Sequence, residues 1–197
     1  METLSERIFR FLAEEARNRT RYIHSIGRQT AKLLEILKRQ GLYQGGAARI
    51  SLIKQLSDFH DIGKICVPPE ILDKPGRLTE EENSMMRMHP VFGGRLVEEL
   101  GRDCASDRET LRLAADICLL HHERLDGSGY PFGLKGDQIP LEIQAVSLAD
   151  AFDALCSERS YKKALPPREA AELICRGECG AFSEELRAAL RDMAGGG

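Results

Sequence analysis

A length of 197 residues suits one domain, or one domain with an appendage, that can bury a sizeable core. With 42% hydrophobic and 30% charged residues, the composition is that of a globular protein. The net charge of −3 argues against general binding of a nucleic-acid polymer, so a local cluster of cations must hold any anionic ligand.

The six cysteines are scattered and include no C-x-x-C pair, which favours buried free thiols in a reducing compartment over disulfides or a zinc site. Residues 1–20 are rich in charge and lack the apolar core of a signal peptide. No stretch approaches the ~18 apolar residues that are needed to cross a bilayer. We therefore expect a soluble, cytoplasmic protein without a membrane segment.

The first predicted helical segment covers residues 3–40. It contains two apolar stripes at helical spacing, and Gly41 is a natural stop. We expect residues 1–20 to form an N-terminal helical extension, either a connector or dimer helix or a solvated cap on the core. Residues 21–193 form the expected main domain, and residues 194–197 are expected to be a disordered tail.

Histidines stand at or near the ends of the next predicted helices. Apolar residues at helical spacing lead from Ile50 to His60, which Asp61 follows directly. A capping box at residues 79–82 starts a helix that leads to His89, where the following proline predicts a kink or a restart.

A third helix, capped at Ser106 and Glu109, ends on the adjacent pair His121 and His122. Two imidazoles seldom end a helix for reasons of propensity alone. A glycine-rich loop of residues 126–136 follows, and its glycines and proline predict a defined shape. This loop either forms a functional lip or only braces the end of the helix.

The last part of the chain is also predicted to be helical. Pro140 opens a helix on which Asp150 and Asp153 share one face, and a final amphipathic helix carries Leu186 and Leu190. No alternating run of apolar residues is long enough to predict a strand. The expected fold is all-α.

Five histidines and two aspartates are candidate metal ligands: His24, His60, Asp61, His89, His121, His122 and Asp150. A single histidine on an apolar face is usually an ordinary core residue, but a buried carboxylate needs a cation or several donors. If the seven converge, they exceed what one tetrahedral ion takes, so two ions are implied, with Asp61 as the natural bridge. Mixed nitrogen and oxygen ligands suit Fe, Mn, Zn, Co or Ni better than Mg or Ca. Such a pair of ions supports phosphate ester hydrolysis.

Ordered motifs along the chain resemble one known family. They are His60-Asp61-Ile62-Gly63-Lys64, His121-His122-Glu123 with Asp126-Gly127 and Gly129-Tyr130-Pro131, Lys74-Pro75-Gly76, and Ala149-Asp150 with Phe152-Asp153-Ala154. Together they closely resemble the HD-GYP family of bacterial cyclic di-GMP phosphodiesterases, a branch of the HD superfamily of metal-dependent phosphohydrolases. The resemblance runs from about His24 to Phe182 and implies the helical HD-superfamily fold, with residues 21–193 as the catalytic domain.

The resemblance also implies roles for single residues. The seven candidate ligands fall on the family's metal positions, with Asp61 similar to its bridging carboxylate; Asp61 and Lys64 are the expected catalytic residues. Lys64 matches the lysine that approaches the substrate phosphate. Further substrate contacts are expected from Asp153, Arg159 and Lys162, and from Tyr130 at the border of the groove. Some relatives carry a glutamate one helical turn before the first histidine and hold a third metal, but that position is Thr20 here, so we expect two ions, Fe or Mn before Zn, Co or Ni.

The expected function is metal-dependent hydrolysis of cyclic di-GMP to the linear dinucleotide, and to GMP if the second step also proceeds. One alternative is an HD phosphohydrolase that acts on another cyclic dinucleotide. The other is a non-catalytic module that senses cyclic di-GMP or docks a cyclase. The expected partners are cyclic di-GMP, GGDEF-domain proteins at the GYP loop and a second copy at the N-terminal helix, but neither nucleic-acid polymer nor membrane.

Overall fold

The computed structural model describes residues 4–15, 26–102, 108–158 and 163–195, and the statements below refer to these ranges. Their α-helices are α1 (Leu4–Glu15), α2 (Gly27–Arg39), α3 (Ala47–Ser57), α4 (Pro69–Leu72), α5 (Glu80–Met86), α6 (His89–Gly101), α7 (Arg108–Leu120), α8 (Leu141–Cys156), α9 (Pro167–Cys175) and α10 (Glu184–Gly195). Two short 3-10 helices are η2 (Ile62–Cys66) and η3 (Gly136–Gln138). Apart from one isolated bridge between Asp126 and Lys135, the described residues form no β-pairing, so the predicted all-α fold is confirmed.

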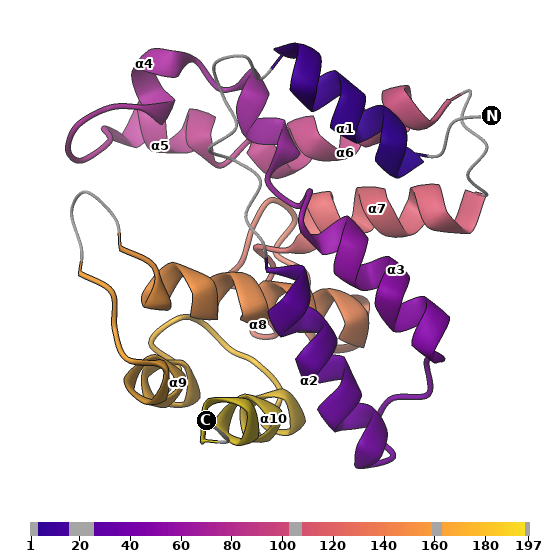
Figure 1. Ribbon diagram of the computed structural model, residues 1–197. Coiled ribbons are helices and arrows are strands. Elements are labelled where there is room, and N and C mark those ends of the chain that lie inside the picture. Colours follow the sequence, from indigo (N-terminus) through magenta and orange to yellow (C-terminus); the bar gives the residue numbers. More distant parts are fainter. Residues whose placement is uncertain (1–3, 16–25, 103–107, 159–162, 196–197) are drawn as a thin grey trace.

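The helices form two groups that meet at α3, α7 and α8. Figure 1 shows α1, α4, α5 and α6 on one side and α2, α9 and α10 on the other, with α7, α3 and α8 between them. α6 packs on α7 and η2, while α8 packs on α2, α7 and α9. Fully buried leucines and isoleucines from both groups form the core, including Ile8 of α1, Leu37 of α2 and Ile117 of α7, which lies between the groups. Within the described ranges, no helix combines the length and apolar character that crossing a bilayer requires.

Several predicted helix boundaries are confirmed. The Thr79 hydroxyl accepts the N–H of Glu82 at 3.3 Å, and the Glu82 carboxylate accepts the N–H of Thr79 at 2.8 Å, which completes the predicted capping box of α5. Gly41 follows α2 with a positive φ of 76°, as a helix stop requires. The proline after His89 marks a restart, since α5 ends at Met86 and α6 begins at His89.

Other boundaries differ from the prediction. α3 ends at Ser57, and His60 lies in the turn that follows, so the helix predicted up to His60 is too long. α9 is not among the predicted elements, although Pro167 in its first turn and the buried Ala170 and Ile174 are ordinary helix signals. α10 includes Ala194 and Gly195 and so extends into the expected tail.

α1 packs along α6. Leu4 and Ile8 are buried there, and Nη1 of Arg7 donates a hydrogen bond to the carbonyl oxygen of Leu100 at 3.1 Å. The helix thus covers part of the core. Its use as a connector or a dimer helix stays a prediction.

Candidate metal centre

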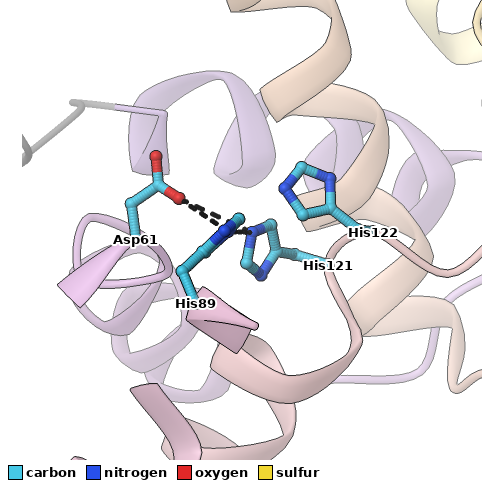
Figure 2. Close-up of side chains that lie close together, drawn as sticks. All are labelled: Asp61, His89, His121 and His122. Atoms are coloured by element: carbon cyan, nitrogen blue, oxygen red, sulfur yellow. Dashed lines mark hydrogen bonds and ion pairs between the residues drawn. The ribbon is translucent and has the colours of Figure 1, made fainter. Parts of the chain in front are cut away.

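Four of the predicted ligands meet at one point, where Asp61, His89, His121 and His122 each offer one atom within 4.8 Å of the others (Figure 2). They come from the residue before η2, the first residue of α6 and the turn after α7. Nε2 of His89 lies 3.2 Å from Oδ1 of Asp61 and 3.3 Å from Nε2 of His121. Three separate segments therefore direct ligand atoms into one buried space.

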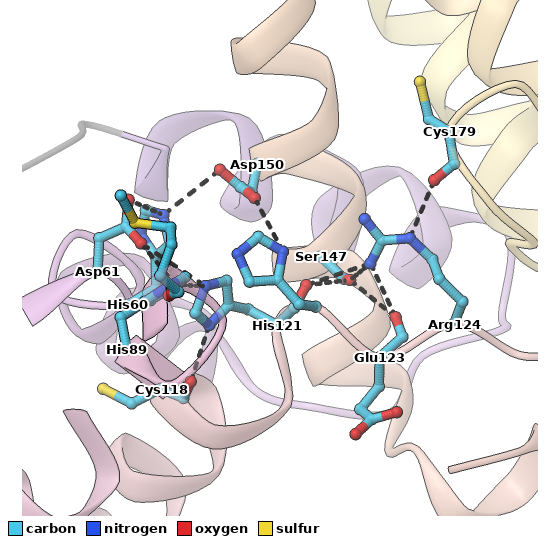
Figure 3. Close-up of polar contacts among 12 residues, drawn as sticks. His60, Asp61, His89, Cys118, His121, Glu123, Arg124, Ser147, Asp150 and Cys179 are labelled. Atoms are coloured by element: carbon cyan, nitrogen blue, oxygen red, sulfur yellow. Dashed lines mark hydrogen bonds and ion pairs between the residues drawn. The ribbon is translucent and has the colours of Figure 1, made fainter. Parts of the chain in front are cut away.

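His60 and Asp150 extend this cluster past Asp61 (Figure 3). Nε2 of His60 lies 3.5 Å from Oδ2 of Asp61 and 3.4 Å from Oδ1 of Asp150. Oδ2 of Asp150 lies 3.9 Å from Nδ1 of His122. Asp61 thus turns Oδ1 toward His89 and Oδ2 toward His60, so its two oxygens face different candidate ligands.

The same local contact orients three of the imidazoles. In His60, His89 and His121, Nδ1 lies 2.8 Å from the carbonyl oxygen of the residue three positions earlier. These carbonyls belong to Ser57, Met86 and Cys118, in the last turns of α3, α5 and α7, where carbonyl groups lack partners within the helix. Because Nδ1 donates to the carbonyl, Nε2 of a neutral ring keeps its lone pair, which faces the cluster.

These acceptor atoms fit a divalent metal ion. Oδ1 of Asp61 is buried and has no hydrogen-bond partner among the described residues, although it lies close to Nε2 of His89 and of His121. Acceptor atoms that face one another in a buried space repel unless a cation lies among them. Imidazole nitrogen with carboxylate oxygen is a donor set of transition metals. The cluster therefore supports divalent metal binding.

The pKa values indicate where this cluster holds charge. Burial raises the pKa of Asp61, but Lys64 and His60 outweigh this effect and hold that pKa well below its usual range. Burial lowers the pKa of His60, but the two aspartates outweigh it and raise the pKa to about 8. For His121 burial prevails and lowers the pKa to about 4, and it also holds the pKa of His122 well below the usual value. At pH 7 both rings of the pair are neutral, which is the form that binds metal.

Two of the predicted substrate residues lie three positions after candidate ligands. Nζ of Lys64 forms an ion pair with Oδ2 of Asp61. Asp153 lies one turn after Asp150 on α8 and accepts a hydrogen bond from Oγ of Ser157 at 3.3 Å. Their contacts with substrate stay predictions. The other candidates His24, Arg159 and Lys162, and also Thr20, lie outside the described residues.

Tyr130 covers one of the candidate ligands. Its ring stacks on that of His122, with the ring centroids 4.6 Å apart and the planes at 23°. The guanidinium carbon of Arg87 lies 4.3 Å from the centroid of the Tyr130 ring. Gly129 permits this contact, because a Cβ there would lie 2.5 Å from the carbonyl oxygen of His122. The loop therefore rests directly on the turn that carries the histidine pair.

Glu123 has a role that the sequence did not reveal. Glu123 is 1% exposed. Its carboxylate accepts hydrogen bonds from the backbone N–H groups of Phe132 at 2.7 Å and Leu134 at 2.9 Å. The carboxylate thus fixes the far side of the loop to the histidine pair. An acidic residue beside the pair, followed by a loop with many backbone donors, is the only sequence signal of this contact.

Arg124, next to Glu123, and Ser147 of α8 brace the same turn (Figure 3). Nη1 of Arg124 donates to the carbonyl oxygen of Glu123 at 2.8 Å and to Oγ of Ser147 at 2.6 Å, while its Nε donates to the carbonyl oxygen of Cys179 at 3.0 Å. Oγ of Ser147 donates in turn to the carbonyl oxygen of His121. Sequence reasoning missed both residues, although Ser147 lies one turn before Asp150.

A comparison with family models places this site in a known family. The model described as HD domain matches residues 55–178, which is more than half of the chain. The chain belongs to the HD domain family. The matched region contains all six of the candidate ligands that the structure describes: His60, Asp61, His89, His121, His122 and Asp150.

Similar proteins confirm the predicted resemblance to the HD-GYP branch of this family. The cyclic di-GMP phosphodiesterase response regulator RpfG of Xanthomonas campestris is 46% identical over 115 residues, 58% of this chain and 29% of that protein. The 3'3'-cGAMP-specific phosphodiesterase 2 of Vibrio cholerae is 43% identical over 121 residues, 61% of this chain and 22% of that protein. The chain thus spans less than a third of the length of these relatives.

A solved structure shares the fold. It is Bd1817, an HDG"Y"P protein from Bdellovibrio bacteriovorus, which matches with a TM-score of 0.64 at 20% identity over 96% of this chain and 60% of that one. At this identity the similarity shows the arrangement of helices alone. This HD-domain fold agrees with the predicted HD-superfamily architecture.

Proposed function

We propose that this chain is a metal-dependent phosphodiesterase that hydrolyses cyclic di-GMP. The observation that carries the proposal is the gathering of six candidate ligands, Asp61 among them, in one cluster, with three imidazoles oriented by helix-end carbonyls. RpfG, whose name includes cyclic di-GMP phosphodiesterase, supports the choice of substrate.

The proposed cofactor is a pair of transition-metal ions, Fe or Mn before Zn, Co or Ni. His60, Asp61, His89, His121, His122 and Asp150 would hold these ions. His24 is the proposed seventh ligand. When bound, such ions polarise phosphoryl oxygens and lower the pKa of water.

The protein's own side chains then bind and orient the phosphodiester. The ammonium group of Lys64, beside Asp61, is placed to hold a phosphate oxygen next to the cluster. Asp153 shares a face with Asp150 and is proposed to contact the dinucleotide, as are Arg159 and Lys162. Tyr130 shields the ring of His122 from water on one side. The proposed product is the linear dinucleotide, with GMP after a second hydrolysis.

A second candidate substrate is another cyclic dinucleotide. Metal ligands do not specify bases, and the relatives include a 3'3'-cGAMP-specific phosphodiesterase. A non-catalytic sensor is the third candidate, but the full set of described candidate ligands favours hydrolysis. The proposal also includes docking of GGDEF-domain proteins at residues 126–136 and pairing of two copies through α1. The proposed location is the cytoplasm.

The test combines elemental analysis of anaerobically purified protein with identification of the products formed from cyclic di-GMP and 3'3'-cGAMP. Asp61→Asn is expected to lose most of its bound metal and to lower hydrolysis by about 100-fold or more, because the carboxylate between the ions is gone. Asp153→Asn, one helical turn after Asp150, is expected to keep its metal and to raise KM. A metal-free Asp61→Asn protein with full activity would refute the proposal.

A further inference from the structure

A cavity adjoins the metal centre on the side of Tyr130. Its volume is about 400 Å³, and its polar lining includes Asn83, Arg87, His122, Arg124, Ser128 and Tyr130. None of the proposed steps at the metal centre uses this space.

The lining of this cavity is positively charged. It contains the guanidinium groups of Arg87 and Arg124 and no carboxylate. Among the described residues, neither arginine forms an ion pair with an acidic side chain: Arg87 lies over the Tyr130 ring, and Arg124 uses Nε and Nη1 for carbonyl oxygens and the Ser147 hydroxyl. In a chain with a net charge of −3, two guanidinium groups without carboxylates between them are a local anion site.

The donors in this cavity suit a phosphate group. Nη2 of Arg124 takes no part in the hydrogen bonds that Arg124 forms with the described residues. Guanidinium groups bind phosphate oxygens through paired N–H donors, and the Asn83 amide adds further donors at the rim. The cavity therefore offers charge and directional donors to the same group.

Tyr130 joins the cavity to the metal centre, because its ring contacts His122 and also lies under Arg87. The cavity, which His122 also lines, is therefore next to the metal centre. A cyclic dinucleotide carries two phosphodiesters, and its linear product carries a terminal phosphate.

We infer that the cavity binds a second phosphate of the nucleotide, one that is not being hydrolysed. The inference rests on the proposed function. It assigns to Arg87 and Arg124 a role in substrate affinity, separate from the chemistry at the metal centre.

The experiment places a negative charge at the cavity rim without removing either arginine. Asn83 and Ser84 are neighbours on α5 and both are exposed, but only Asn83 lines the cavity. Asn83→Asp is expected to raise KM for cyclic di-GMP by about tenfold, because the new carboxylate repels the phosphate, and to change kcat much less. Ser84→Asp adds the same charge to the same helix and is expected to keep both constants within about twofold.

Inhibition by the linear dinucleotide separates the two sources of phosphate. If the terminal phosphate of the product binds here, Asn83→Asp weakens inhibition by the product more than it raises KM. If the second phosphodiester of the substrate binds here, the change in KM is the larger one. If Asn83→Asp and Ser84→Asp have equal KM values and equal inhibition constants for the product, the inference is overturned.

Failure of the proposed function gives a different result. A wild-type protein that hydrolyses no cyclic dinucleotide refutes the phosphodiesterase, and calorimetric titration with 5'-GMP then tests the cavity by itself. Weaker binding by Asn83→Asp than by Ser84→Asp supports the cavity as a phosphate site, and equal binding by the two variants overturns it.

Discussion

Glu123 shows how a single side chain can give a defined shape to a loop without helix or strand. Burial of a carboxylate is costly unless donors replace water. Here the N–H groups of Phe132 and Leu134 do so, one to each oxygen. The loop that carries Tyr130 is thus fixed at both ends, by Glu123 on one side and by the contact of Gly129 with the His122 turn on the other.

Glu123→Gln tests this anchor. The amide offers one acceptor and turns its own donor toward an N–H group, so we expect the free energy of unfolding to fall by about 1–3 kcal/mol. Urea denaturation measures the change. Glu99→Gln serves as the control, because among the described residues the Glu99 side chain pairs only with the exposed Arg102, and it is expected to change stability by less than about 0.5 kcal/mol. Equal stability of both variants would contradict the anchor.

The metal centre depends on how closely two short elements approach each other. η2 lies against the first turn of α6, and a Cβ at Gly63 would lie only 2.0 Å from the carbonyl oxygen of His89 and 2.3 Å from the backbone nitrogen of Gly93. Asp61 and His89 flank this contact. The glycine two residues after Asp61 therefore sets the separation of two candidate ligands.

Gly63→Ala is expected to force η2 and α6 apart. Because backbone atoms cannot move aside as a flexible side chain can, we expect a loss of about 3 kcal/mol in stability together with loss of bound metal. Thermal unfolding and elemental analysis measure the two effects. Gly195→Ala is the matched control, since nothing lies within 4 Å of its Cβ position, and its stability should change by less than about 0.5 kcal/mol. Normal metal content in Gly63→Ala would show that the close approach is dispensable.

A partly buried polar cluster ties α3 to α8. Arg49 of α3 donates from Nε to Oε1 of Glu142 at 3.0 Å and from Nη2 to Oε2 at 2.6 Å, and the Tyr43 hydroxyl donates to Oε1 at 2.6 Å. Burial raises the pKa of Glu142, but the hydrogen bonds from Arg49 and Tyr43 outweigh it, so the pKa in the folded protein is below its usual value.

This cluster makes a pH dependence that can be measured. Because the folded pKa is depressed, the unfolded chain takes up a proton first as the pH falls. The stabilisation is complete above the ordinary glutamate pKa of about 4.3. It is lost as the pH falls through the pKa that Glu142 has in the folded protein. Between pH 7 and pH 3, wild type should lose about 1–2 kcal/mol more stability than Glu142→Gln. Parallel losses in the two proteins would exclude the contribution of this pair.

At the scale of the whole molecule, local patterns in the sequence predicted the elements better than the contacts between them. The capping box of Thr79 and Glu82 is legible because its two residues are three positions apart. The link from Ser147 to His121 spans 26 positions, and neither residue shows the contact by itself. His60 and Asp61 are candidate ligands from their residue types and positions, but their convergence with the other ligands was predicted through family resemblance, since spacing alone does not establish that separate helices converge.

A bound metal should stabilise the whole fold, because the ligands come from segments that are distant in sequence. Removal of the metal with a chelator is expected to lower the Tm by on the order of 10 °C, and added Mn²⁺ or anaerobic Fe²⁺ should restore it. Differential scanning calorimetry gives the measurement. The Tm of Asp61→Asn should not decrease further when chelator is added. An equal decrease in the Tm of wild type and Asp61→Asn would contradict the assignment of Asp61 as a metal ligand.

The three carbonyls that orient His60, His89 and His121 also bring the C-terminal ends of α3, α5 and α7 to one place. Each end carries a partial negative charge, in addition to the carboxylates of Asp61 and Asp150. Without its ions, the pocket has, among the described residues, only Lys64 and His60 to set against these negative charges, so it offers a phosphodiester little attraction. Metal and nucleotide should therefore load in a compulsory sequence, metal first, so that the cell's metal supply decides whether the nucleotide is bound at this centre.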